Sequence, residues 1–322
     1  MLFFKNIVTG TAVSALFFLA ASFIPFIGSV VIVFTPLPIL YYYSKIGRGG
    51  GGLVFFLSAI LVSLPLGFMH TEWHLLIYVT MGLIGIVLAE MFHGGRSVET
   101  TVIFPVAVIL TLFFAFLGYQ SHISGQMPWS LVENNISGVI QENIRFYESQ
   151  GLSPEVISLI KSDLPRITNF FTMIFPALFL ITISITVIMN VISGKALLQL
   201  RQLTYPDFGD LACWKAPEKL VWLLILSGMG LLGSIMTSAP SWVGLAGLNV
   251  LIICMFVYLL QGFSIVAYVF RKRNIPWFFR YAFYMLIFMM QYLVLVIAMV
   301  GLFDLWIDFR KYVRIKDKTI DI

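Results

Sequence analysis

Long apolar runs without charge alternate with short charged segments along this chain. The longest run covers residues 220–270, and the others cover 6–44, 49–71, 73–89, 100–132, 167–194 and 281–303. A helical crossing of a bilayer core requires about 20 apolar residues, so the longest run has room for two. Only structures that satisfy their own backbone hydrogen bonds can cross lipid, so the pattern predicts an all-α, polytopic transmembrane helical bundle.

A window of about 20 residues predicts nine spans, within a range of eight to ten. They fall at 6–24, 27–43, 52–69, 74–92, 101–119, 167–193, 219–238, 243–270 and 278–303. Pro36 and Pro38 interrupt the second span. Proline frees backbone groups that neighbouring protein or water must then satisfy, so we expect 24–40 to be buried in the bundle, where it can line a cavity. The glycine-rich run 47–52 predicts a flexible inner loop.

Three parts follow from these spans. Residues 1–195 form a six-helix membrane bundle, 196–218 a cytoplasmic linker, and 219–322 the C-terminal transmembrane helices with a basic tail. The first part includes an external amphipathic segment, 120–166, whose apolar residues from Val132 to Ile144 recur at helical spacing. Ser153 and Pro154 predict the start of a second amphipathic helix there.

Charge sets the orientation. Only 11% of the residues are charged, and the net charge of +5 comes from short loop clusters. This pattern excludes nucleic-acid binding and fits a multi-pass membrane protein with its N-terminus in the cytoplasm. Nine crossings, however, would export the basic segment 310–318. Either the last apolar stretch doubles back as a hairpin, or the chain has eight crossings. The sequence between Tyr281 and Val300 contains no turn residue that would support a hairpin, so both alternatives stay open.

Glu90 is the only carboxylate inside a span before the C-terminal region. An ionisable group at membrane depth is costly and often functional, but Glu90 also lies near enough to His93 and Arg96 to pair at the interface. The glycines in 228–233 match a dinucleotide-binding pattern, yet they fall inside an apolar helix without the required strand and acidic residue. We therefore expect a helix contact there, and neither a cofactor nor a metal site.

Asp304 and Asp308 are four residues apart and are expected to share a helical face, with Arg310 following and Trp306 at the interface. Two interpretations stay open: an Asp–Arg pair bonded to the inner loops, or a binding site for a partner protein or lipid head group. Pro217 and Glu218 are expected to start a helix.

Two segments carry a family resemblance. Residues 211–222, which include Trp214, Pro217 and Glu218, and residues 301–311, which include Asp304, Trp306, Asp308 and Arg310, resemble the YybS-type family of uncharacterised bacterial multi-pass membrane proteins. The element Pro36-Leu37-Pro38 fits that family as well. Its first six helices are similar to the substrate-binding (S) components of energy-coupling-factor transporters.

The resemblance implies a six-helix bundle with both ends inside, which holds a vitamin or metal ion near the outer face. Coupling subunits of such transporters grip an Ala-x-x-x-Ala pair on the first helix. The nearest equivalent here is Thr11 and Ala15, beside Gly10 and Ser14. The C-terminal helices have no counterpart in a minimal S component.

Two functions compete. The first is a small-molecule binding or transport component, with the bilayer and possible coupling subunits as partners. The alternative is a non-transport membrane scaffold or assembly partner that displays Trp214, Trp306 and Arg310. No Ser/His, H-E-x-x-H or paired-Asp constellation lies within the spans, so we do not expect an enzyme. Few polar residues are expected to be buried in the spans, which favours a small apolar or aromatic ligand.

Overall fold

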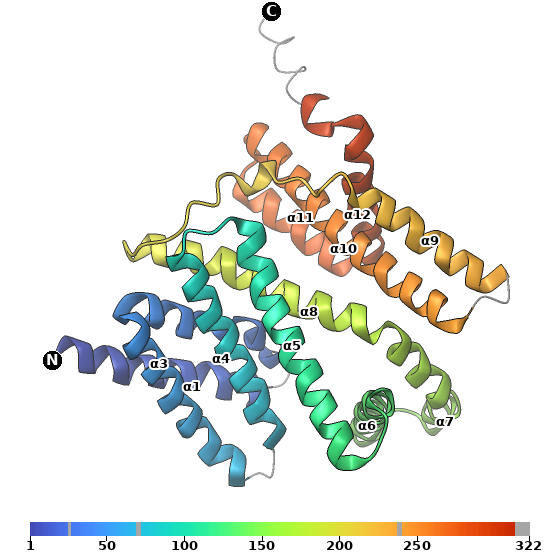
Figure 1. The fold of residues 1–322 in the computed structure, drawn as a ribbon, viewed down its shortest axis with the longest axis horizontal. Coiled ribbons are helices and arrows are strands. Elements are labelled where there is room, and N and C mark those ends of the chain that lie inside the picture. The colour runs from blue at the N-terminus through green and yellow to red at the C-terminus, as the bar shows by residue number, and fades with distance from the viewer. Residues whose placement is uncertain (25–26, 69–71, 237–239, 313–322) are drawn as a thin grey trace, which may run out of the picture. The chain divides into compact units, whose positions relative to one another are not determined.

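Helices make up all the regular structure in the part of the chain that the computed structural model describes, residues 1–24, 27–68, 72–236 and 240–312 (Figure 1). Six helices are long and apolar enough to cross a membrane: 2–23, 28–64, 75–93, 98–124, 164–200 and 242–272. A bent helix pair, 277–287 with 291–307, and a shorter apolar helix, 220–236, add to them. The polytopic all-α membrane architecture is confirmed, whereas the nine separate spans are not reproduced.

The chain forms two compact units. The first unit comprises Met1–Pro128 and Thr182–Phe208, and the second comprises Trp129–Ile181 and Gly209–Ile322. The functional division at residues 195 and 218 stays a prediction.

The first unit contains five elements and part of a sixth. They are α1 (Leu2–Phe23), α2 with η1 (Ile27–Val31, Ile32–Phe34), α3 (Pro36–Phe68), α4 (Glu72–His93), α5 (Val98–Ser124) and the second half of α8 (Leu164–Leu200). Its core is the cluster Ala15, Phe18, Ile39, Val62 and Tyr78. The rings of Phe18 and Tyr78 meet edge to face with centroids 4.9 Å apart, an arrangement that aromatic quadrupoles favour.

The α3 helix doubles back on itself at Gly47. That residue has φ 80° and ψ 176°, a conformation that glycine adopts without steric cost. A Cβ on Gly10 of α1 would lie 2.8 Å from Tyr42 and 3.0 Å from Val54, both in α3. In a straight helix these two residues would be about 18 Å apart along the axis. The turn expected between the second and third spans is therefore present at Gly47, but the rest of the run 48–52 is helical and not a flexible loop.

The segment 24–40, expected to be buried, is buried only in its C-terminal part, since Ile24 and Val30 are exposed. Pro36 and Pro38 lie in the interior of the first unit. The carbonyl of Val33, just before the break, accepts a hydrogen bond of 2.7 Å from the side-chain amide of Asn190 in α8. A neighbouring helix thus supplies a hydrogen bond to a backbone carbonyl that lacks a partner next to the prolines. The cavity expected beside this segment stays a prediction.

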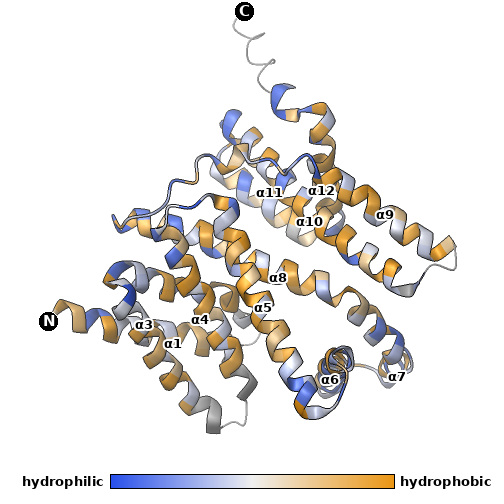
Figure 2. Ribbon diagram, viewed as in Figure 1, coloured by the Kyte–Doolittle hydropathy of each residue, from blue (hydrophilic) through white to orange (hydrophobic). Residues whose placement is uncertain are grey.

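The second unit contains the amphipathic helices and the C-terminal helices. They are α6 (Pro128–Ser149), α7 (Pro154–Ser162), the first half of α8, η2 (Leu211–Cys213), α9 (Leu220–Met236), α10 (Ser241–Lys272), α11 (Trp277–Met289) and α12 (Gln291–Ile307). Val132 and Ile144 on the apolar stripe of α6 are buried, and Ser153 precedes α7 as expected. Figure 2 shows mixed polar and apolar residues along α6 and α7 and mainly apolar residues along α9.

Glycines set the spacing between α9 and α10, which run side by side. A Cβ on Gly247 of α10 would lie 2.8 Å from the Ser227 carbonyl oxygen of α9. Gly228 and Gly230 of α9 make looser contacts with α10, and no atom lies within 4 Å of a Cβ at Gly233. The dinucleotide-like glycines thus belong to a helix contact, but the closest approach comes from α10.

A side chain of α10 replaces a helical hydrogen bond that is missing next to a second proline, Pro176. Pro176 lies inside α8, and the Asn249 side chain accepts a 2.9 Å hydrogen bond from the Ala177 N–H. The same side chain donates a 2.8 Å hydrogen bond to the Met173 carbonyl. Asn249 therefore bridges the two backbone groups that an intact helix would join directly.

The last apolar stretch is not one straight span. At Met290 (φ −106°, ψ 90°) the helix breaks, and α11 and α12 are bent by 107°. The span expected over 278–303 is therefore a bent pair of helices, which is either a broken span or a re-entrant loop. The break needs no proline or glycine, because α12 is held across α10 where Gly262 and Gly301 let the two backbones touch.

Candidate functional site

The linker after residue 208 lies along α10 and runs from its C-terminal end towards its middle. Arg271 near that end binds both carboxylate oxygens of Asp210, with 2.6 Å between Nη1 and Oδ1. Further along, the Ala216 N–H donates a 3.0 Å hydrogen bond to the side-chain oxygen of Gln261. Two polar side chains of α10 one turn apart, Gln261 and Ser264, thus hold the linker, whose backbone forms only the single 3-10 turn η2 and is otherwise non-helical as far as Pro217.

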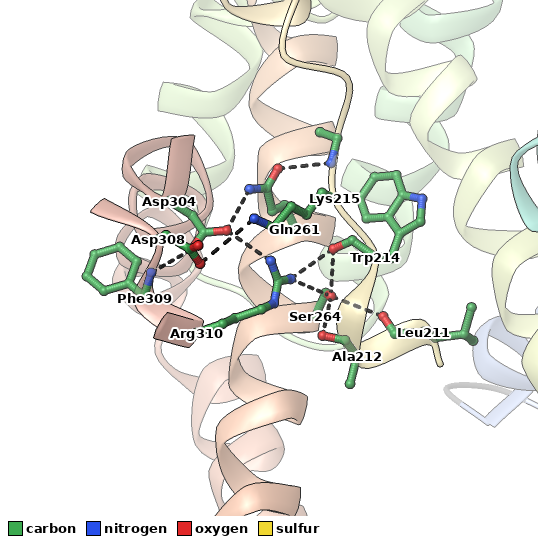
Figure 3. Close-up of polar contacts among 11 residues, drawn as sticks. Leu211, Ala212, Trp214, Lys215, Gln261, Ser264, Asp304, Asp308, Phe309 and Arg310 are labelled. Carbon is green, nitrogen blue, oxygen red and sulfur yellow. Dashed lines mark hydrogen bonds and ion pairs between the residues drawn. The ribbon is translucent and has the colours of Figure 1, made fainter. Parts of the chain in front are cut away.

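The carboxylate of Asp304 is the centre of the cluster that forms there (Figure 3). This residue is 3% exposed. Oδ2 accepts hydrogen bonds of 3.0 Å from Gln261 and from Arg310, and Oδ1 accepts one of 2.9 Å from the Phe309 N–H. Three donors therefore compensate the cost of burying the charge.

Arg310 closes the cluster from the other side. It is 5% exposed, and its Nη2 donates to the Trp214 carbonyl and to the Ser264 hydroxyl, both at 2.9 Å. The Ser264 hydroxyl also lies 3.0 Å from the carbonyl oxygens of Leu211 and Ala212. A single guanidinium thereby joins α12 to the linker, which its planar fork of donors suits. Figure 3 shows these side chains converging between α10, the linker and the end of α12. We call Gln261, Ser264, Asp304, Arg310 and the linker carbonyls they bind the clasp.

A left-handed residue brings Arg310 back to Asp304. Asp308 ends α12 with φ 46° and ψ 68°, and its N–H donates to the Asp304 carbonyl at 3.1 Å. The expectation that Asp304 and Asp308 share one helical face is therefore wrong. Asp308 is half exposed and lies 3.8 Å from the ammonium of Lys215, an ion pair of the kind that contributes about 0–1 kcal/mol.

The other predicted residues surround the clasp without joining its side-chain network. Trp306 is 65% exposed beside Phe303, which fits an interfacial aromatic, and Trp214 contributes its backbone carbonyl. Pro217 and Glu218 precede α9, which begins at Leu220, so they do not form its first turn. The expected display of Arg310 to a partner is wrong, because the guanidinium is buried inside the unit.

Two groups at the exposed edge of the linker have shifted acidity. The Arg271 guanidinium holds the pKa of the Asp210 carboxyl well below its ordinary value, because it binds the ionised form. The contribution of this pair to folding is therefore complete above about pH 4 and is lost as the pH falls through the lowered pKa. The thiol of Cys213 donates to Asp210 at 3.1 Å, and this bond, followed by burial, raises the pKa of the thiol.

Replacing Asp210 by asparagine is expected to speed alkylation of Cys213. The carboxylate stabilises the protonated thiol, so its loss lowers the pKa and raises the thiolate fraction at pH 8. Maleimide labelling rates of the detergent-solubilised protein measure the effect. Cys213 is exposed and Cys254 is buried, so a Cys213→Ser variant supplies the background. An unchanged or slower rate in Asp210→Asn contradicts the expectation.

Glu90 in the first unit is paired, but not with the expected residues. Arg48 binds it with two hydrogen bonds of 2.8 and 2.7 Å, and the hydroxyl of Tyr43 donates a third of 2.5 Å. Because Arg48 follows the break at Gly47, these bonds tie both arms of α3 to α4. The pair lies at an exposed edge of the unit, where the Arg48 side chain is 78% exposed. This geometry is that of an interfacial ion pair and leaves a coupling role untested.

Sequence reasoning missed the polar side chains inside the spans. Asn190, Asn249, Gln261 and Ser264 are all buried, together with several Ser and Thr residues, so the expectation of few buried polar groups is wrong. Each stands alone in an apolar run. An isolated Asn or Gln in a membrane helix is the signal that would have identified them, since it requires a partner there.

The small-residue face of α1 packs inside the first unit. Ser14 and Ala15 are 0% and 1% exposed, and Gly10 contacts Tyr42 and Val54 of α3. This face is therefore not open to a coupling subunit, which corrects the docking role that the transporter resemblance implies for Thr11 and Ala15. No group of three or more His, Cys, Asp or Glu residues suited to a metal occurs in the part of the chain that the structure describes.

The chemistry of the clasp is that of a permanent connector. Its carboxylate and guanidinium bind each other, an amide and backbone groups of the same chain. These bonds fix the linker against α10 and α12, although the buried Nε of Arg310 has no hydrogen-bond partner among the described protein atoms.

Comparison with known proteins places the chain in a family without an assigned activity. No curated protein and no solved structure matches it. A family model described as "Predicted membrane protein (DUF2232)" matches residues 12–305, a segment that includes Asp304 and most of the helical elements described above. Since the match covers nearly the whole chain, the protein belongs to the DUF2232 family of membrane proteins.

Proposed function

We propose that this protein is a non-catalytic component of the bacterial cytoplasmic membrane that binds a small molecule within its first unit. In this proposal the role is that of an S component, as the sequence resemblance of residues 1–195 implies. One observation carries the proposal: the side-chain oxygen of Asn190 is buried beside the broken start of α3 and has no hydrogen-bond partner among the described protein atoms.

The orientation of the Asn190 amide follows from its neighbours. Its nitrogen donates to the carbonyls of Val33 at 2.7 Å and Thr186 at 2.8 Å, and both are pure acceptors. The oxygen is therefore left over. Asn249 provides the contrast, because its oxygen is occupied by the Ala177 N–H. A buried acceptor without a hydrogen bond lowers the stability of the fold by about 1–3 kcal/mol. The presence of one here therefore favours a ligand that donates a hydrogen bond to it.

Other buried hydroxyls of the first unit share this property. The hydroxyl oxygens of Thr11, Ser14 and Ser44 have no hydrogen-bond partner among the described protein atoms. The core of the same unit is formed by Phe18, Tyr78 and aliphatic side chains. A mainly apolar interior with a few free polar atoms suits a small apolar or aromatic molecule that carries a hydrogen-bond donor. Broken helices at membrane depth supply such sites in transporters.

Native mass spectrometry of the protein released gently from its own membranes tests the proposal. A bound molecule of defined mass is expected on the wild-type chain and at least tenfold less of it on Asn190→Ala. Asn249→Ala is the matched control. It also removes a side-chain amide beside a proline in a helix, but the oxygen of Asn249 already accepts a hydrogen bond from the Ala177 N–H. It is expected to keep the molecule. Equal ligand on all three chains, or ligand on none, contradicts the proposal.

A scaffold role is the second candidate, and close packing favours it. A Cβ at Gly85 would lie 2.6 Å from a backbone oxygen, and one at Gly247 would lie 2.8 Å from another. At these contacts the helix backbones therefore pack directly against each other, without room for a side chain. The same spectra separate the two functions. A co-purifying protein without a small molecule supports the scaffold, whereas a small molecule that depends on Asn190 supports the binding component.

A further inference from the structure

The bent pair α11–α12 is too sharply folded to act as one straight crossing. α11 has 13 residues and α12 has 17, which correspond to about 20 Å and 26 Å of helix. A bilayer core is about 30 Å thick. Two such helices bent by 107° cannot lie along one membrane normal.

The first of these helices runs back beside the end of α10. Phe283 and Tyr284 of α11 meet Phe270 of α10, with ring centroids 5.3 and 6.0 Å apart. Tyr284 also lies 6.3 Å from Phe263, two turns deeper in α10. Arg280 donates to the carbonyls of Ile275 and Phe270 and so closes the corner between the helices.

The second helix crosses α10 and then returns towards the same end. Gly301 of α12 touches the backbone of Tyr258, the deepest of the contacts described here. Asp304 binds Gln261, and Arg310 binds Ser264, which lies only eight residues, or about 12 Å, before Lys272. From Tyr258 to Ser264 the partner positions on α10 move back in the direction of the end where α11 began.

The length of α10 is consistent with this depth. It has 32 residues, or about 48 Å, which exceeds the ~30 Å core by roughly three turns. Counted from its start at Ser241, about 30 Å of helix ends near Gln261. The clasp, the linker and α11 therefore lie against the C-terminal part of α10, from about Gln261 to Arg271.

We infer that α11 and α12 enter and leave the membrane on one side, so that the C-terminal tail lies on the same side as the linker 209–219. The chain then crosses eight times: by α1, by the two arms formed by α2 with α3, and by α4, α5, α8, α9 and α10. The 17-residue α9 crosses by modest local adjustment of the bilayer.

Charge agrees with this topology. With eight crossings, Arg310 and Lys311 lie on the side of Arg271, Lys215 and Lys219, as the positive-inside rule requires. The rest of the basic tail lies outside the described residues. The conflict that nine crossings create is removed without a turn residue, because the bend at Met290 is stabilised by the glycine crossing and the clasp.

Cysteine accessibility in intact and opened cells tests the inference. The probe is a membrane-impermeant maleimide, and the variant is Lys311→Cys in a Cys213→Ser, Cys254→Ser background. The native Cys213 in Cys254→Ser marks the linker side, and Pro240→Cys, at the start of α10, marks the other side. Lys311 and Pro240 are exposed, so labelling reports sidedness.

Position 311 is expected to label like Cys213, only in opened cells, and position 240 in intact cells. Labelling of position 311 together with position 240 overturns the inference. Tyr312→Cys, also exposed, repeats the measurement if Lys311→Cys is not produced. The result does not depend on ligand binding, so it is independent of the proposed function.

Discussion

Arg310→Ala is expected to lower the stability of the second unit by about 3–5 kcal/mol. The replacement leaves the Asp304 carboxylate buried with two of its three donors, and it also removes one of the two donors near the Trp214 carbonyl, the other being the Ser264 hydroxyl. The cost comes mainly from the uncompensated charge and not from the loss of attraction, because a buried pair itself contributes little net stability. Thermal unfolding in detergent, followed by tryptophan fluorescence, measures the loss.

Two controls separate the clasp from a general loss of positive charge. Lys311→Ala removes an adjacent exposed cation and is expected to change stability by less than about 0.5 kcal/mol. The double variant Asp304→Leu with Arg310→Met is expected to recover part of the loss, since it leaves no unpaired charge. If Arg310→Ala unfolds like wild type, the guanidinium does not hold the linker.

Gly301→Ala is the second change with a large expected effect, at about 1–3 kcal/mol. A Cβ at this position would overlap the carbonyl oxygen of Tyr258 and lie 2.8 Å from the Gly262 nitrogen. Both are backbone atoms, so neither can move without shifting α10. The displacement is expected to weaken the contact between Asp304 and Gln261 as well, because that bond lies one turn further along α12. Unfolding in detergent again provides the measurement.

Gly233→Ala is the matched control, since no atom lies within 4 Å of a Cβ there. Alanine in an open helical position is expected to be neutral or stabilising by up to about 1 kcal/mol. Equal behaviour of the two variants would show that α12 does not cross α10 in close contact.

The sequence predicts the class of protein, and it offers the pairing of Asp304 with Arg310 as one of two interpretations, because both follow from local composition. Apolar runs of membrane length identify the helices without knowledge of their neighbours. An Asp and an Arg six residues apart at a helix end lie within reach of each other in many geometries. The burial of that pair did not follow, since it depends on Asp308 adopting a left-handed conformation.

The remaining differences come from contacts between distant segments. The break at Met290 has no proline or glycine to announce it and depends on Gly262, which is 28 residues away in α10. Gln261 and Ser264 acquire their partners from a linker about 50 residues earlier. Five glycines in the six positions 47–52 weaken a helix, so this run predicts a loop. Packing against α1 and α4 overrides that propensity here.

The clasp also constrains the order in which the protein can be completed during synthesis. The Trp214 carbonyl and the Arg310 guanidinium that serves it are separated by 96 residues. At translation rates of about 5–20 residues per second, roughly 5–20 s pass between their appearance. During that interval α9 and α10 can insert into the membrane as a helical hairpin. The Trp214 carbonyl of the linker still lacks its hydrogen bond from Arg310. A chain that stops before Arg310 therefore resembles an assembly intermediate, and membrane quality-control proteases would meet an unclasped linker.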